Sequence, residues 1–159
     1  MCRSEKKCIV LDAANIAMAY GKHINFRAHG IALAKEQLEA KGYDVRAVIS
    51  ERPPRNHKFD EPELIEQWWQ EGWLTKVDAS SHDDDTCLAL ARELNCPLVS
   101  GDAYRLEVTK REPEESAKLE LWLKYNRYQF RWSKDTFLII PPTANSNFFP
   151  ENRLHSGRY

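Results

Sequence analysis

Short apolar runs alternate along the chain with longer segments in which apolar residues recur every three or four positions. The first run, residues 8–11, is apolar throughout, which is typical of a parallel strand covered on both faces. The longer segments are typical of amphipathic helices. Strands are expected at residues 8–11, 44–50, 74–77, 98–99, 128–132 and 136–140, and helices at 28–41, 61–72, 83–94 and 113–125. Asp60 is expected to cap the helix that follows it.

Strands that alternate with helices indicate βαβ units, and therefore a mainly parallel sheet flanked by helices. The chain has 159 residues, of which 42% are hydrophobic and 30% charged, so one globular domain with a substantial core is expected. Residues 1–7 and 143–159 show no periodicity. The domain is therefore predicted to span residues 8–142, with both ends as loops.

The net charge and the cysteine content exclude few classes of function, but they indicate how basic residues would have to be placed and in which state the cysteines are expected. The formal net charge is −1, so a nucleic-acid binder would have to gather its basic residues on one face. No apolar run approaches the roughly 20 residues of a membrane span, and no secretory signal follows Met1. The four cysteines show no C-x-x-C spacing, and we interpret them as reduced, small core residues of an intracellular protein, cytoplasmic or nuclear.

Acidic residues recur where predicted strands end and where one helix begins. Asp12 and Asp102 each follow a strand, and Asp83–Asp85 begin the helix that leads toward Asp102. Ligands of open α/β sheets bind at the carboxyl ends of the strands, so these acids meet if the first and fourth strands are neighbours. Clustered carboxylates need a cation, and Mg²⁺ or Mn²⁺ could there activate a water for phosphodiester hydrolysis. The alternative is that Asp83–Asp85 only cap the helix.

Four segments together resemble the NYN/PIN-like endoribonuclease domain of the Regnase type, the nuclease domain of CCCH-finger mRNA-decay proteins. They are IVLDAANIAMAYG, FRAHGIALAKEQLEAKGYDVRAVI, HDDDTCLALARELNCPLVSGDAYR and KDTFLIIPP, and they run from about Cys8 to Pro142. The resemblance implies a PIN-like (Rossmannoid) three-layer fold with a mainly parallel central sheet. It also implies an Mg²⁺-dependent endoribonuclease that acts on single-stranded or loop RNA in RNA decay, with Mn²⁺ able to substitute.

The family pattern also implies roles for particular residues. The metal site would be Asp12, Asp83, Asp84 and Asp102, and Asn15 would form a hydrogen bond within the site. The family's D-G-S-N is here Asp12-Ala13-Ala14-Asn15, and its further acid, four positions after Asp102, is Leu106, with Glu107 beside it. The chain contains no CCCH finger. These departures leave open a catalytically weakened domain that binds RNA or acts as a scaffold.

RNA contacts and other activities are less closely specified. Basic residues near the expected rim could pair with phosphates; they are Lys22, Arg27, Arg55, Lys58 and Arg105. Aromatic residues at 128, 130 and 132, interleaved with basic ones, either stack on RNA or pack as an edge strand. A phosphatase of the HAD type would need a second acid at Ala14. Besides RNA, a second copy of the chain or a recruiting protein is an expected partner, and a membrane is not.

Overall fold

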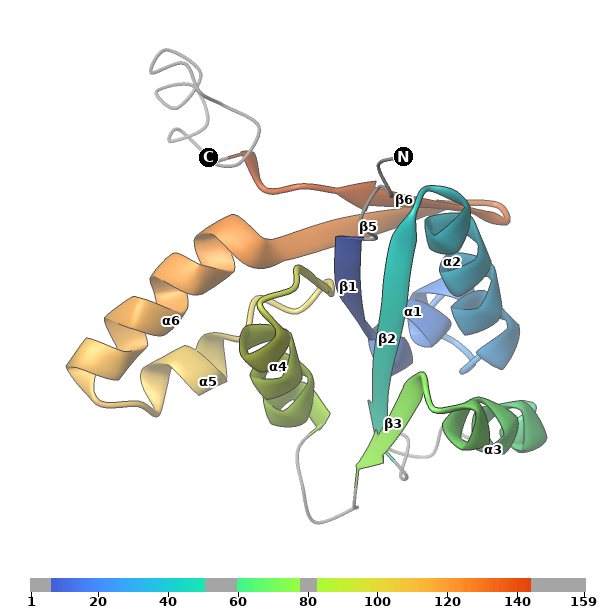
Figure 1. Cartoon of the computed structure of the whole chain (residues 1–159), viewed down its shortest axis with the longest axis horizontal. Helices are drawn as coiled ribbons and strands as arrows, with labels where there is room; N and C mark the ends of the chain where they lie inside the picture. The colour runs from blue at the N-terminus through green and yellow to red at the C-terminus, as the bar shows by residue number, and fades with distance from the viewer. Residues whose placement is uncertain (1–6, 51–59, 78–82, 144–159) are drawn as a thin grey trace, which may run out of the picture.

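A computed structural model describes residues 7–50, 60–77 and 83–143; the side chains of Ser50 and of residues 83–85 are not described. Strands and helices alternate along most of the chain (Figure 1). The strands are β1 (Lys7–Asp12), β2 (Tyr43–Ser50), β3 (Leu74–Val77), β4 (Leu98–Val99), β5 (Arg127–Ser133) and β6 (Thr136–Ile140). The helices are α1 (Ala13–Tyr20), α2 (Ala28–Ala40), α3 (Pro62–Glu71), α4 (Asp83–Leu94), α5 (Arg105–Thr109) and α6 (Pro113–Asn126).

The strands form one sheet in the order β3-β2-β1-β4-β5-β6. All neighbouring pairs are parallel except β5 and β6, which are antiparallel. From β1 the chain builds β2 and β3 toward one edge, and it then returns to place β4 on the other side of β1. The strand order therefore reverses between β1 and β4, which is the position where open α/β sheets bind ligands.

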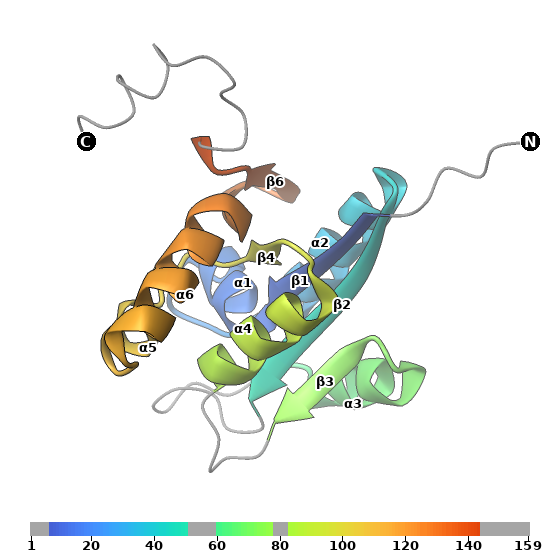
Figure 2. The same cartoon turned by 60° about the vertical axis from the view of Figure 1, so that its left-hand side comes forward.

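Helices cover both faces of the sheet, as the two views show (Figures 1 and 2). Along β1, Ile9 and Leu11 belong to the core shared with α1, α2 and α3, whereas Val10 belongs to the core shared with α4, α5 and α6. Alternate side chains of a strand point to opposite faces, so an apolar run such as β1 supplies both cores at once. The expected three-layer α/β fold with a mainly parallel sheet is confirmed.

Two helices, α1 and α5, were not expected from the sequence. Helix α1 has eight residues and begins directly after β1, with Asp12 as its N-cap: the carboxylate accepts a hydrogen bond from the Asn15 backbone N–H at 3.3 Å. Four of its residues are buried, so it lacks the polar face that marks an amphipathic helix. Helix α5 has only five residues, too few to show a helical period.

Asp60 caps a different helix from the one that the sequence suggests. Its Oδ1 atom accepts a hydrogen bond at 2.9 Å from the backbone N–H of Ala28, the first residue of α2. The N-cap residue of α3 is Glu61, whose side chain makes no capping bond, and Pro62 occupies the first turn. The expected cap of α3 by Asp60 is therefore wrong, because the partner of Asp60 lies 32 residues away in the chain.

Replacing Asp60 with alanine is expected to lower the free energy of unfolding by about 1 kcal/mol, the usual effect of losing an N-cap. The change removes the acceptor for the Ala28 N–H at the start of α2. Urea unfolding monitored by circular dichroism measures it. Asp44→Ala is the matched control, because Asp44 is exposed on β2 and caps no helix. An equal loss of stability in both variants would contradict the capping role.

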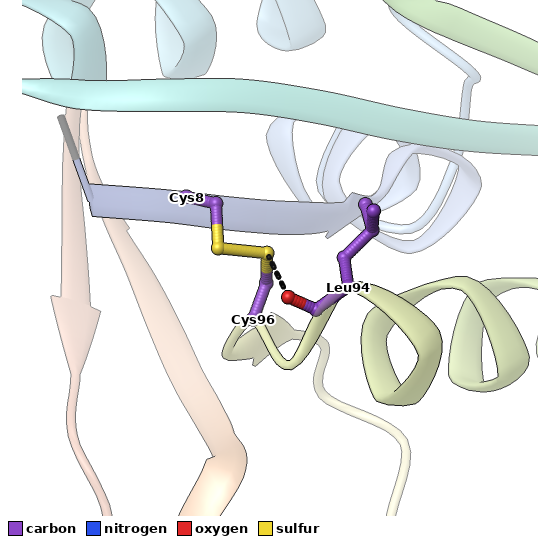
Figure 3. Close-up of a disulfide and its surroundings, with 3 residues drawn as sticks. All are labelled: Cys8, Leu94 and Cys96. Atoms are coloured by element: carbon purple, nitrogen blue, oxygen red, sulfur yellow. Dashed lines mark hydrogen bonds between the residues drawn. A yellow bond between two sulfur atoms is a disulfide. The ribbon is translucent and has the colours of Figure 1, made fainter.

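A disulfide joins Cys8 in β1 to Cys96 in the turn before β4, with a Cα–Cα distance of 5.4 Å (Figure 3). The Sγ atom of Cys96 also lies 3.6 Å from the carbonyl oxygen of Leu94. The interpretation of the cysteines as reduced is wrong for this pair, since the pairing of β1 with β4 brings together residues 88 positions apart. Cys87 is not part of a disulfide and is buried in the core, as expected, and Cys2 lies outside the described residues.

Within the described ranges, none of the helices combines the length and the apolar character that crossing a membrane would require.

Candidate active site

Asp12 is a buried carboxylate at the point where the strand order reverses. It is the last residue of β1, and only 4% of its surface is exposed. Its Oδ2 atom accepts hydrogen bonds from the Ser100 hydroxyl at 2.8 Å and from the Tyr104 hydroxyl at 3.3 Å. Together with the N-cap bond to α1, these contacts hold both carboxylate oxygens in place. An ionised carboxylate only accepts hydrogen bonds, and each of these three groups can donate one to it.

The loop after β4 connects Asp102 to Asp12 through a single hydroxyl group. The Ser100 Oγ atom, which donates to Asp12, accepts a hydrogen bond from the Asp102 backbone N–H at 3.0 Å. The Oδ1 atom of Asp102 in turn accepts the Tyr104 backbone N–H at 2.8 Å. Asp102 therefore lies in this loop, three residues beyond the end of β4, and it is placed against Asp12 by the fully buried Ser100.

Asn15 contacts the same loop from the first turn of α1. Its Oδ1 atom accepts a hydrogen bond from the Gly101 backbone N–H at 2.8 Å. A Cβ atom on residue 101 would lie 3.0 Å from that oxygen, so glycine permits the close approach. Asn15 was expected to form a hydrogen bond within the site that orients an acid, a water or a phosphate. The structure shows that its side chain bonds to the backbone beside Asp102.

The predicted ligands Asp83 and Asp84 are placed only through their backbone. Helix α4 begins at Asp83, after residues 78–82 connect it to the carboxyl end of β3, and it packs against β1 and β2. Its first turn lies at the carboxyl edge of the sheet (Figure 2). Their ligand roles stay predictions, since their side chains are outside the described set. Among the side chains that are described, no three His, Cys, Asp or Glu residues gather as a metal site.

Ser100 and Tyr104 are site residues that sequence reasoning missed. Tyr104 is fully buried and has a left-handed backbone, with φ 56°, which is uncommon for a residue with a side chain. This conformation ends the Asp102 loop and begins α5. A serine between a buried strand and Gly-Asp is a signal that could have identified Ser100. No pattern marks Tyr104, because its hydroxyl reaches Asp12 across 92 positions of sequence.

Two neighbouring residues of α5, at the point where the chain departs from the family pattern, differ in exposure. Leu106, which stands where the family has a further acid, is 76% exposed, whereas Glu107 is buried. The side chains of Asp12, Asp102 and Glu107 are all described, and they do not come together as a three-residue metal site. The structure therefore gives no support to Glu107 as a substitute for the missing acid.

The described residues among those expected to contact RNA lie on different parts of the chain. Arg105 is the first residue of α5, three positions after Asp102, and Lys22 is exposed in the turn after α1. Arg27 is engaged within the fold: its Nε atom lies 3.9 Å from Asp60, and its guanidinium lies 5.3 Å from the centre of the Tyr20 ring. Arg55 and Lys58 fall outside the described residues.

The aromatic residues of β5 pack within the fold. The Trp132 indole donates a hydrogen bond at 3.3 Å to the Ile16 carbonyl, and the Phe130 ring stacks 5.4 Å from the ring of Phe137. This confirms packing as the interpretation of these side chains. The strand itself is not at the edge of the sheet, however, because β6 lies outside it.

The mainly parallel six-stranded sheet, with helices on both faces, has a PIN-like α/β fold. The chain belongs to the family described as the Zc3h12a-like ribonuclease NYN domain, whose model matches residues 5–148. This confirms the resemblance that the sequence motifs indicate. The family is one of ribonuclease domains, so RNA is the class of substrate that membership implies.

Two solved structures of a plant enzyme share the fold. A crystal structure of nuclear proteinaceous RNase P 2 (PRORP2) from Arabidopsis thaliana matches with a TM-score of 0.64 and 19% identity, over 88% of this chain and 31% of that one. A second structure, of the Arabidopsis thaliana nuclear protein-only RNase P 2, matches with a TM-score of 0.65 and 19% identity, over 88% and 30%. This chain spans about a third of the length of these proteins.

Proposed function

We propose that this domain is a metal-dependent endoribonuclease that hydrolyses phosphodiester bonds in single-stranded or loop RNA. One observation carries the proposal: the Ser100 hydroxyl connects the carboxylate of Asp12 to the backbone of Asp102, at the point of strand reversal. Membership in a ribonuclease family supports the same conclusion. The process that such an activity would serve is RNA decay.

The residues at this rim suit a hard divalent cation. One oxygen of Asp102 accepts the Tyr104 N–H, and the other accepts no hydrogen bond from the described residues, so it is available to a ligand. Carboxylate oxygens are the donors that Mg²⁺ and Mn²⁺ prefer. Asp12, Asp83, Asp84 and Asp102 would hold the ion. When bound, it would activate a water and offset the negative charge that develops on the phosphorus.

The chain's own side chains would fix the geometry of the reaction. Ser100 and Tyr104 hold the Asp12 carboxylate, and Asn15 holds the backbone beside Asp102. Ser100 and Tyr104 are themselves fully buried, and Asn15 lies in the first turn of α1. Such support matters because a displacement of about 1 Å at a reacting group can reduce the rate about 100-fold.

The test uses end-labelled and circular single-stranded RNA with Mg²⁺, Mn²⁺ or EDTA. We expect the wild-type protein to cut within the labelled RNA and to open the circle, which has no ends for an exonuclease. EDTA should prevent both reactions, since the acids alone cannot replace the cation. The double variant Asp83→Asn/Asp84→Asn should show neither product in Mg²⁺.

Asp44→Asn is the matched control for that variant. It makes the same chemical change in an exposed residue near the amino end of β2, at the opposite edge of the sheet. It should cleave as the wild type does. Cleavage in the presence of EDTA, or equal cleavage by the double variant and the wild type, would contradict the proposal.

A second candidate is a catalytically weakened domain that binds RNA or acts as a scaffold. The exposed Leu106, in place of the family's further acid, favours it. This candidate predicts salt-sensitive binding of RNA without cleavage in either metal. The phosphatase alternative is disfavoured. It would need an acid two positions after Asp12, and that residue is Ala14, which is buried within α1.

A further inference from the structure

A cavity of about 380 Å³ opens beside the Asp102 loop, between α5, α6 and the start of β5. Three cationic side chains line it: Arg105, Lys124 and Arg127. The carboxylate that lines it belongs to Glu120, so the lining has an excess of two positive charges. This local excess contrasts with the whole chain, whose formal net charge is −1. The cavity is therefore a place where an anion would be attracted.

The three cations have few partners of their own. None of the described carboxylates lies within ion-pair distance of them. Arg127 donates one hydrogen bond, at 3.3 Å, to the Ser100 carbonyl, and the Lys124 ammonium lies 5.8 Å from the centre of the Tyr125 ring. Like charges around one cavity repel each other, so an anion that enters it relieves this repulsion.

The cavity also has apolar walls. Val108 from α5 and Leu123 from α6 are both buried and both line it. Apolar walls with a few charged groups are typical of small-ligand sites, and the volume lies near the lower end of their range of about 300–1,000 Å³. That combination suits a single nucleotide: the base against the apolar side chains and the phosphate on the cations. Glu120 adds an acceptor for an amino group of the base.

The cavity and the acids share one loop. Arg127 bonds to the carbonyl of Ser100, and the hydroxyl of the same residue bonds to Asp12 and to the Asp102 backbone. Arg105 follows Asp102 by three positions. An RNA strand that places one phosphate at Asp12 and Asp102 would therefore place a neighbouring nucleotide at the cavity.

We propose that this cavity binds a nucleotide flanking the scissile bond, with its phosphate on Arg105, Lys124 and Arg127. The inference rests on the proposed function, since it takes the acids of Asp12 and Asp102 as the place of cleavage. The cavity would contribute to affinity for the RNA strand, and the acids would supply the chemistry. Loss of a cation should thus weaken binding without slowing the reaction of bound RNA.

The first measurement is RNA binding in an Asp102→Asn background, where cleavage does not interfere. Lys124→Gln and Arg105→Gln are each compared with Lys118→Gln, which removes the same charge from α6 at a residue that does not line the cavity. Affinity for a labelled single-stranded oligonucleotide is measured between 50 and 200 mM salt. Each cavity variant should reduce the magnitude of the slope of log K against log salt by about 0.7. Its affinity should therefore fall about 2.6-fold less than that of the parent protein over that range. Lys118→Gln should leave the slope unchanged.

The second measurement is cleavage kinetics in the otherwise wild-type chain. Lys124→Gln should raise KM and leave kcat unchanged, and thermal melting should show an intact fold. Cleavage by the wild type, together with unchanged salt slopes in both cavity variants, would contradict the proposed nucleotide site and leave the proposed nuclease function in place. Reduced slopes without any wild-type cleavage would support the cavity as an RNA site and overturn the nuclease.

Discussion

Asp102→Asn is expected to reduce RNA cleavage at least about 100-fold, the scale on which precisely placed polar groups act in enzymes. The change removes a negative charge from the proposed metal site. The fold should survive, because the asparagine side chain keeps an oxygen that can accept the Tyr104 N–H in the place of Oδ1. Single-turnover cleavage of a labelled RNA measures the effect, and a thermal melt of the same sample reports on the fold.

The control for Asp102→Asn is again Asp44→Asn, which carries the same change in charge at the opposite edge of the sheet. Its cleavage rate should match that of the wild type. If a clean preparation of Asp102→Asn cleaved at the wild-type rate, Asp102 would have no part in the reaction. The assignment of the site would then be wrong, even if the domain is a ribonuclease.

Removing the disulfide is expected to lower the free energy of unfolding by about 4.6 kcal/mol in the chain-entropy treatment of cross-links. Cys8 and Cys96 are 88 positions apart, so their bond restricts a long loop of the unfolded chain. Urea unfolding of the wild type and of Cys8→Ser/Cys96→Ser under oxidising conditions measures the difference. For a chain of this size, such a change corresponds to a fall in Tm of about 9–18 °C.

A reducing agent provides the control for this second prediction. With the bond reduced, the wild type and the double variant should unfold at nearly the same urea concentration. The stability of Cys87→Ala, which changes the buried cysteine outside the disulfide, should still depend on the reductant. Equal stability of the wild type and the double variant without reductant would show that the bond does not constrain the unfolded chain.

The hydrophobic pattern was enough to predict most elements of the fold. Strand β6 has the bounds expected, Thr136–Ile140, and α2 differs by one residue at its end. Each combines a clear period with a stop signal, such as Gly42 after α2, which has φ 93°. Helices α1 and α5 were missed because one is buried nearly all round and the other is a single turn.

Asp12 and Asp102, two acids of the candidate site, were identifiable from the sequence, whereas Ser100 and Tyr104, which hold Asp12, were not. Asp12 and Asp102 each follow an apolar run, so the carboxyl ends of the strands identify both from sequence alone. Ser100 and Tyr104 reach Asp12 only because β1 pairs with β4. The hydrophobic pattern of a strand does not show which strand it pairs with. The bond between the two cysteines depends on the same strand pairing, and the partner of Asp60 was missed because it lies 32 positions away in the chain.

The central position of β1 also has a consequence for how the domain is made in the cell. Residues 7–77 contain β1, β2 and β3, which can pair while the rest of the chain is still being synthesised, since N-terminal segments fold first. Ser100 and Asp102 belong to the half that emerges later, and the Ser100 N–H is satisfied by the carbonyl of Tyr128 in β5. While only residues 7–77 have been synthesised, Asp12 is present without Ser100 and Asp102, so the candidate site can form only after the later part of the domain has been made.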